Sequence, residues 1–98
     1  MYHYHMVVQF FAYYRDNDFA GCKETSMQPV KTLKELGEVL GDRYGEKFRN
    51  EYFDASGEAI GEKTIILVNG RRAEFLDGIN TELNDTDTVS IFPVVAGG

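Results

Sequence analysis

The sequence predicts an α+β fold, with one mixed sheet of four to five strands and one main helix across one face. Three observations predict it. The chain has 98 residues, which fits one domain rather than two. The candidate elements follow in the order two strands, a helix, then two or three strands. The run from Met6 to Tyr13 is apolar on both faces, so we expect the last strand to lie beside the first strand and parallel to it.

Two strands begin the predicted sheet. Residues 6–13 are rich in β-branched and aromatic side chains, and their continuous apolar character predicts a central strand that is covered on both faces. The polar segment 15–18 supplies turn residues. Residues 23–27 then predict a returning strand with polar side chains facing water, so this pair of strands indicates a hairpin with a loose loop.

The helix is predicted from Leu33 to Tyr44, because Thr32 and Glu35 have the spacing of a capping box. An apolar stripe follows at helical spacing. Its members are Leu33, Leu36, Val39, Leu40 and Tyr44. Gly45 is the expected left-handed stop of this helix.

Two glycines lie inside this predicted helix. Gly37 and Gly41 each weaken it by up to about 1 kcal/mol, which the apolar stripe should outweigh. Beyond the helix, residues 46–63 combine apolar and turn-like signals. That segment predicts only a variable excursion.

The C-terminal third of the chain predicts the remaining strands. Residues 64–68 form a clear strand, and Asn69-Gly70 after it tolerates two positive φ values in a tight turn. Residues 71–75 predict a short returning strand. A turn at 84–87 leads into a last strand over 88–92, whose apolar members alternate toward one face before Pro93. This succession of elements is that of the β-grasp plan.

Composition narrows the classes of function. Ten Lys and Arg against sixteen Asp and Glu give a net charge of −6, so we expect neither nucleic acid nor membrane as a partner. The single cysteine, Cys22, cannot close an internal disulfide, and no zinc-ligand spacing is present. No apolar run approaches the ~20 residues of a bilayer span, and no signal-peptide pattern is present. We therefore expect a cytoplasmic protein without a metal.

The C-terminus carries the most specific pattern of the sequence. It runs Ile91-Phe92-Pro93-Val94-Val95-Ala96-Gly97-Gly98. In isolation, two terminal glycines would indicate only a frayed chain end. Together with segments 10–15 and 67–70, this ending resembles the MoaD/ThiS-type ubiquitin-like sulfur carriers, most closely the small subunit of molybdopterin synthase. The resemblance extends from Met6 onward, with Val94 in place of a second proline and a longer middle region over 54–63.

The resemblance implies the chemistry of the chain end. A terminal carboxylate is ionised at neutral pH and must be activated before it reacts. By the resemblance, an E1-like adenylating enzyme uses ATP to form an acyl-adenylate at Gly98, and sulfur displaces AMP to give a thiocarboxylate. The sulfur then passes to a pterin precursor, held by the large catalytic subunit of molybdopterin synthase, in molybdenum cofactor biosynthesis. The chain itself would bind no cofactor and would not be an enzyme on its own.

The expected organisation is an N-terminal extension or tag over residues 1–5, a β-grasp domain over 6–93 and a flexible tail over 94–98. Terminal glycines let a chain enter a channel that is too narrow for side chains. Five extended residues reach about 16 Å, enough for a buried site in a partner. The expected partner contacts are Gly97, Ala96, Val95, Val94, Pro93, Phe92 and Phe75. Packing in the core is the alternative for both phenylalanines.

Other functions stay open at this point. They are a thiamin-type or tungsten-pterin sulfur carrier, a ubiquitin-like modifier that joins Gly98 to a lysine, and a binding module with a passive tail. Among other candidate residues, Cys22 could be a nucleophile but is more simply a loop or strand residue. His3 and His5 could bind a stray metal, although a chain end makes this incidental.

Charged residues have equally plain interpretations. Arg71 and Arg72 fit a solvated hairpin, with docking to an acidic partner surface as the alternative. Four carboxylates of the helix and its end predict a solvated helix face rather than an acid/base pair. They are Glu35, Glu38, Asp42 and Glu46.

Overall fold

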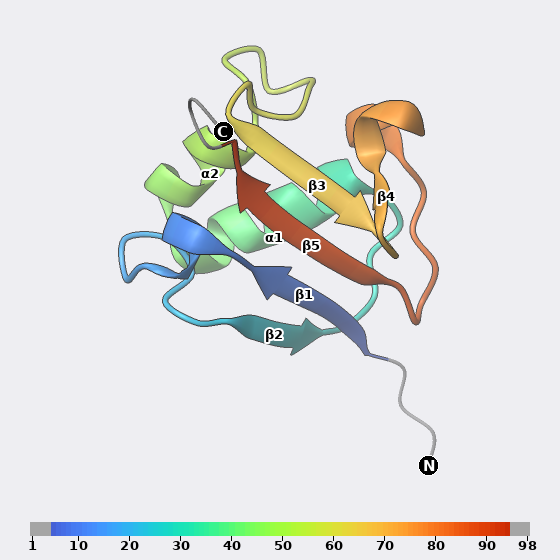
Figure 1. The fold of residues 1–98 in the computed structure, drawn as a ribbon, viewed down its shortest axis with the longest axis horizontal. Helices are drawn as coiled ribbons and strands as arrows, with labels where there is room; N and C mark the ends of the chain where they lie inside the picture. The colour runs from blue at the N-terminus through green and yellow to red at the C-terminus, as the bar shows by residue number, and fades with distance from the viewer. Residues whose placement is uncertain (1–4, 95–98) are drawn as a thin grey trace.

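Five strands form one sheet in the computed structural model, which describes residues 5–94. They are β1 (Met6–Phe10), β2 (Glu24–Met27), β3 (Thr64–Val68), β4 (Arg71–Arg72) and β5 (Thr88–Pro93). Their spatial order is β2-β1-β5-β3-β4 (Figure 1). β5 pairs with β1 in parallel and with β3 in antiparallel orientation. The predicted mixed sheet, with the last strand beside the first, is therefore confirmed.

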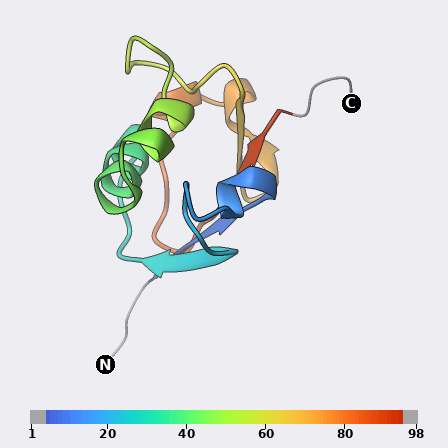
Figure 2. The same ribbon diagram turned by 90° about the vertical axis from the view of Figure 1, so that its left-hand side faces the viewer.

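The first strand is central, but it is covered on one face only. Met6, Val8 and Phe10 are fully buried, whereas Val7 and Gln9 are half-buried. The helices α1 (Leu33–Tyr44) and α2 (Glu46–Tyr52) lie on the same face of the sheet, and no helix within 5–94 covers the other (Figure 2). The prediction of a strand covered on both faces was wrong, because its alternate residues lie on this bare face.

The first strand is also shorter than predicted. It ends at Phe10, and Ala12–Arg15 form a short 3-10 helix, η1. The fully buried Tyr14 lies with its hydroxyl 2.6 Å from Thr64 Oγ1, which donates to Glu51 O at 2.8 Å. The last three residues of the predicted strand, 11–13, therefore lie outside β1, and the buried Tyr14 after them belongs to a turn that packs against α2.

The helix α1 has the predicted bounds. Glu35 N donates to Thr32 Oγ1 at 3.2 Å, and Glu35 Oε1 accepts from Lys31 N at 3.0 Å. The capping box forms, with its return contact one residue further upstream than the usual pattern. Gly45 ends the helix at φ 104° and ψ −177°, a positive φ that favours glycine, but the predicted left-handed helical conformation is not adopted.

The short helix α2 was not predicted, since its region indicated only an excursion. It buries Phe48 and Tyr52, which are four residues apart and therefore share one helix face. The Tyr52 hydroxyl donates to Leu33 O at 2.6 Å, which joins the two helices. A loop follows, closed by a bridge between Phe53 and Ile60.

The two glycines inside α1 have a packing role. A Cβ added at Gly37 would overlap the Tyr52 ring, and one added at Gly41 would lie 2.8 Å from Arg49 Cζ. The glycines therefore let α1 and α2 approach closely, which offsets their unfavourable helix propensity.

The hairpin after β3 turns as predicted, with Asn69 at φ 52° and Gly70 at φ 83°. The returning strand was predicted over 71–75, but β4 has only two residues, and Ala73–Phe75 form a second 3-10 helix, η2. Ala73 is fully buried, so the chain turns inward after β4 instead of continuing along the sheet edge.

The turn before β5 is held by a buried carboxylate. Asp87 is 6% exposed, and its oxygens accept from Asn84 N and Asn69 Nδ2, both at 2.8 Å. Asn69 Oδ1 in turn accepts from Thr88 N at 2.9 Å. These bonds fasten the two turns at this end of the sheet to each other. Within the described part of the chain, no helix has the length and apolar character needed to cross a bilayer.

Gly37→Ala should destabilise the protein by about 1–3 kcal/mol, because the Tyr52 ring is buried and cannot move away from the new methyl group. Gly41→Ala is the matched control. It should change stability by less than about 1 kcal/mol, because the Arg49 side chain is flexible and alanine favours the helix. Urea unfolding of both variants measures the difference. Equal effects would contradict the packing role of Gly37.

Stability should also fall at alkaline pH. Burial and the hydrogen bond from its hydroxyl to Glu51 raise the pKa of Tyr13 to about 12, and burial raises the pKa of Tyr14 and Tyr52. The folded protein holds these protons more tightly than the unfolded chain. The contribution of these three tyrosines to stability is therefore fully present below about pH 10. It is lost as pH rises through about 10 to 12. Urea unfolding against pH should show this decline, and Tyr13→Phe should make it shallower. A decline that begins below about pH 9 would contradict this assignment.

Candidate functional site

The predicted contact residues fall into two groups. Four of them lie within the described residues, namely Phe75, Phe92, Pro93 and Val94. The others lie outside the described residues, so their roles stay predictions. These are Val95, Ala96, Gly97 and Gly98.

The end of β5 is held on both sides. Phe11 N donates to Ile91 O at 3.0 Å, which extends the pairing with the first strand. On the other side, Val94 N donates to Lys63 O at 2.7 Å, one residue beyond β5. Pro93 is buried, whereas Val94 is 47% exposed. The sheet therefore fixes the path of the chain up to residue 94, where the sequence-predicted tail begins.

Apolar side chains gather on the bare face of the sheet beside this strand end. The rings of Phe11 and Phe92 stack with centroids 4.4 Å apart and planes 10° apart. Ile65 is paired with Phe92 in the sheet, and Leu67 shares its side of β3. We call these four half-buried residues, Phe11, Ile65, Leu67 and Phe92, the outer patch. Because Phe92 lies there, it is not one of the fully buried core residues.

Two arginine side chains lie near the outer patch, Arg15 in η1 after the end of β1 and Arg72 on the edge strand β4. Arg15 Cζ lies 5.0 Å from the Phe11 ring centroid. On the β4 side, Arg72 Cζ lies 5.5 Å from the ring of Phe75, and Arg72 pairs with Glu74. Phe75 is 77% exposed, which excludes the interpretation that it packs at an edge of the core. Contacts of this kind keep a guanidinium oriented at a surface.

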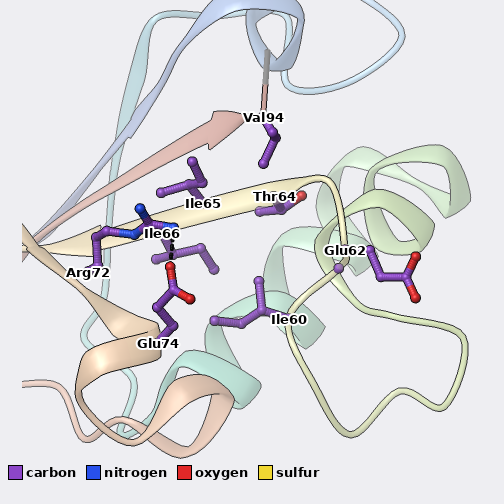
Figure 3. Close-up of a pocket in the computed structure, with 9 residues that line it drawn as sticks. Ile60, Glu62, Thr64, Ile65, Ile66, Arg72, Glu74 and Val94 are labelled. Atoms are coloured by element: carbon purple, nitrogen blue, oxygen red, sulfur yellow. Dashed lines mark ion pairs between the residues drawn. The ribbon is translucent and has the colours of Figure 1, made fainter. Parts of the chain in front are cut away.

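A small groove borders the strand end. It measures about 230 Å³. The side chains that border it are Ile60, Glu62, Thr64, Ile65, Ile66, Arg72, Glu74 and Val94 (Figure 3). Sites that enclose small organic ligands usually measure about 300–1,000 Å³. The size of the groove therefore fits a single peptide side chain better than a small-molecule substrate.

The other candidate residues gain no support as catalysts. Cys22 Sγ lies 3.8 Å from the Tyr44 hydroxyl. Burial raises the pKa of Tyr44, so this hydroxyl keeps its proton at neutral pH and cannot act as a general base for the thiol. His5 is exposed, and His3 lies outside the described residues. Within residues 5–94, no group of three or more His, Cys, Asp or Glu side chains is placed to hold a metal ion.

The helix carboxylates have structural partners, as the solvated-face interpretation expects. Asp42 Oδ1 lies 2.6 Å from Arg49 Nη2, and Glu46 Oε1 lies 4.0 Å from Arg49 Nε. Glu35 caps its own helix. Glu38 is exposed.

Sequence reasoning missed the surface position of Phe11 and the stacked position of Arg15. Both were absorbed into the predicted strand and turn. The alternation of β1 places every second side chain on the bare face, and Phe11 continues that alternation from Val7 and Gln9. Period-2 counting from the buried Phe10 could have found it.

The fold, the bare sheet face and the Gly97-Gly98 ending of the sequence define a ubiquitin-like β-grasp protein. The profile of the ThiS family matches residues 8–98, so the chain belongs to the ThiS family. The similarity to MoaD/ThiS-type carriers that the C-terminal ending indicated is therefore confirmed.

Similar proteins support this membership. Small archaeal modifier protein 3 of Haloferax volcanii is 43% identical over 68 residues, which cover 64% of this chain and 68% of that protein. The solution structure of small archaeal modifier protein 1 from Methanosarcina acetivorans has a TM-score of 0.78 and 28% identity, with 100% of both chains covered. A putative molybdopterin converting factor, subunit 1, from Pyrococcus furiosus has a TM-score of 0.71 and 32% identity, with 94% of this chain and 99% of that chain covered.

The position of Phe92 on the surface can be tested by truncation. Phe92→Ala removes a half-exposed ring and one stacking contact, so it should lower the free energy of unfolding by about 1 kcal/mol. Phe10→Ala is the control, and it should lower it by about 3–5 kcal/mol because Phe10 is fully buried. Urea unfolding measures both values. Similar losses in the two variants would place Phe92 in the core.

Proposed function

We propose that this chain is a sulfur carrier whose C-terminal Gly98 is adenylated and then converted to a thiocarboxylate. One observation carries the proposal. The Gly97-Gly98 ending follows, within five residues, a strand end that is held on both sides and bordered by the half-buried outer patch. Membership of the ThiS family supports the same chemistry.

The chemistry needs a partner enzyme, because a carboxylate is a poor electrophile at neutral pH. An oxygen of the Gly98 carboxylate attacks the α-phosphorus of ATP, and pyrophosphate leaves. Hydrosulfide then attacks the carbonyl carbon of the acyl-adenylate and AMP leaves, so the carbon–sulfur bond of the thiocarboxylate replaces the carbon–oxygen bond to AMP. ATP is bound by the adenylating partner, and the carrier supplies only the reacting carboxylate.

The outer patch is the docking face in this proposal. Its four apolar side chains are half-buried, and apolar side chains that gather at a surface mark regions that partners cover. Phe92 directly precedes Pro93 in the chain, and Phe11 stacks on Phe92. A partner that covers these two rings is therefore next to the residues that lead to Gly98. Pro93 fixes φ at the start of the tail, and Val94 and Val95 favour extended backbone. The expected order of binding is the patch first and the tail second.

For the sulfur acceptor, we propose the pterin precursor held by the large catalytic subunit of molybdopterin synthase. The 32% identity to a putative molybdopterin converting factor subunit supports this choice. Thiamin-type and tungsten-pterin acceptors use the same carrier chemistry at Gly98. They differ only in the partner that takes the sulfur.

A second candidate function is that of a protein modifier, in which Gly98 is joined to a lysine of another protein. The 43% identity to small archaeal modifier protein 3 favours it. Both functions begin with the same adenylation of Gly98. They diverge at the nucleophile, which is sulfur for the carrier and a lysine amine for the modifier.

Intact-mass analysis of the protein from its native host distinguishes these functions. A gain of about 16 Da, from oxygen replaced by sulfur, is expected for the carrier. A Gly-Gly remnant on lysines of other proteins after digestion would favour the modifier. An unmodified terminus, even with the adenylating enzyme and ATP supplied, would contradict both.

Deletion of Gly98 is expected to abolish sulfur loading. It should leave the melting temperature unchanged, because the hydrogen bond from Val94 N to Lys63 O, four residues before Gly98, is the last one of the described backbone. Circular dichroism measures folding, and intact mass measures loading. Persistent loading in this variant would show that another group receives the sulfur.

A further inference from the structure

The guanidinium group of Arg15 is fixed beside the outer patch. Its Nε donates to Phe10 O at 2.7 Å, and its Cζ lies 5.0 Å from the Phe11 ring centroid. Phe11 in turn stacks on Phe92. Arg15, Phe11 and Phe92 therefore form a continuous row that runs from η1 to the residue before Pro93.

Arg15 keeps most of its hydrogen-bonding capacity. A guanidinium carries five N–H donors, and the contact with Phe10 O uses only the one on Nε. No ion pair includes Arg15 among the residues that the structure describes, whereas Lys34, Lys47 and Arg49 are all paired with carboxylates. A side chain that is already held by a hydrogen bond and a ring loses little freedom when it binds a partner.

The distribution of charge on the protein affects where a carboxylate of a partner can bind. The chain has a net charge of −6, and exposed carboxylates lie along both helices on the far side of the sheet. The helices themselves carry five carboxylates and four basic side chains, three of which are already paired, so they offer a partner carboxylate at most one open cation. Exposed Asp16 follows Arg15 in the chain, but the Nη donors of Arg15 remain open to a carboxylate of the partner. Such local attraction within an acidic molecule fixes the orientation in which two proteins meet.

We infer that Arg15 is a specificity-determining contact that pairs with a carboxylate of the adenylating partner when the partner covers the outer patch. This inference rests on the proposed function. Apolar side chains of the partner cover Phe11 and Phe92, and the carboxylate accepts from the two Nη groups, since Nε is engaged. A two-point contact of this kind fixes orientation as well as distance. It therefore aligns the end of β5 with the site that receives Gly98.

The test measures adenylation as exchange of labelled pyrophosphate into ATP, with the full chain and the adenylating enzyme of its native host. Arg15→Glu should raise the KM for the carrier about tenfold or more and change kcat less than about twofold, because it repels the carboxylate and leaves Gly98 unchanged. Arg15→Lys keeps the charge but loses the planar fork, so an intermediate rise is expected. Salt should raise the KM of the wild type more steeply than that of Arg15→Glu.

Arg43→Glu is the matched control. Arg43 also lies over an aromatic ring, with Cζ 6.0 Å from the Tyr44 centroid, but it belongs to α1 on the other side of the sheet. It should leave the KM unchanged. Circular dichroism checks folding, and Arg15→Gln, which removes the charge without reversing it, replaces Arg15→Glu if that variant does not fold.

Two results would overturn the inference while leaving the proposed function intact. One is an equal KM for the wild type and the Arg15 variants, and the other is an equal rise in Arg43→Glu. Absence of exchange with the wild-type chain would instead refute the proposed function, and this inference with it. A rise in KM confined to the Arg15 variants supports the contact.

Discussion

The parallel pairing of β1 with β5 determines where every part of the candidate site lies. It brings the first and last strands of the sequence into register, with Val7 opposite Thr88 and Phe10 opposite Ile91. One further hydrogen bond, from Phe11 N to Ile91 O, continues this pairing beyond the strands. The two phenylalanines of the outer patch are neighbours for this reason alone, since they are 81 positions apart in the chain.

The core explains why this arrangement leaves one face of the sheet bare. Aromatic rings fill the space between sheet and helices, with Phe48 lying 5.8 Å from Phe10 and 5.4 Å from both Tyr14 and Tyr44. The contacts of Phe48 with Phe10 and Tyr14 are edge-on, and such contacts stabilise a core beyond the area that they bury. Helices α1 and α2 both pack on the core side of the sheet, and Gly37 lets them approach each other closely. The apolar side chains opposite are left for other molecules.

Patterns of local sequence predicted much of this fold. The α1 cap at Thr32, the turn at Asn69 and the order of the elements follow from nearest-neighbour chemistry, which the sequence displays directly. The prediction was wrong where long-range packing decides. Seven residues are too short a span for helix α2 to show a clear period, and its anchors Phe48 and Tyr52 acquire their role only against the sheet.

The candidate site divides in the same way. The proposed role of the Gly97-Gly98 ending could be inferred from the sequence, because it depends on residue type and position in the chain. The Arg15–Phe11–Phe92 row could not, because it joins the first loop to the last strand through a pairing that only the folded sheet creates. Residues 6–13 are also almost continuously apolar, so the sequence does not show that Phe10 faces the core and Phe11 the surface.

Parallel neighbours in a sheet start at the same edge and finish at the same edge. The chain therefore enters this fold at one pole, beside Met6, and leaves at the opposite pole, beside Val94 (Figure 1). A fusion partner or a surface tether joined ahead of the first strand thus sits across the molecule from the chain exit. The protein can be held by one pole while the other remains open to large molecules.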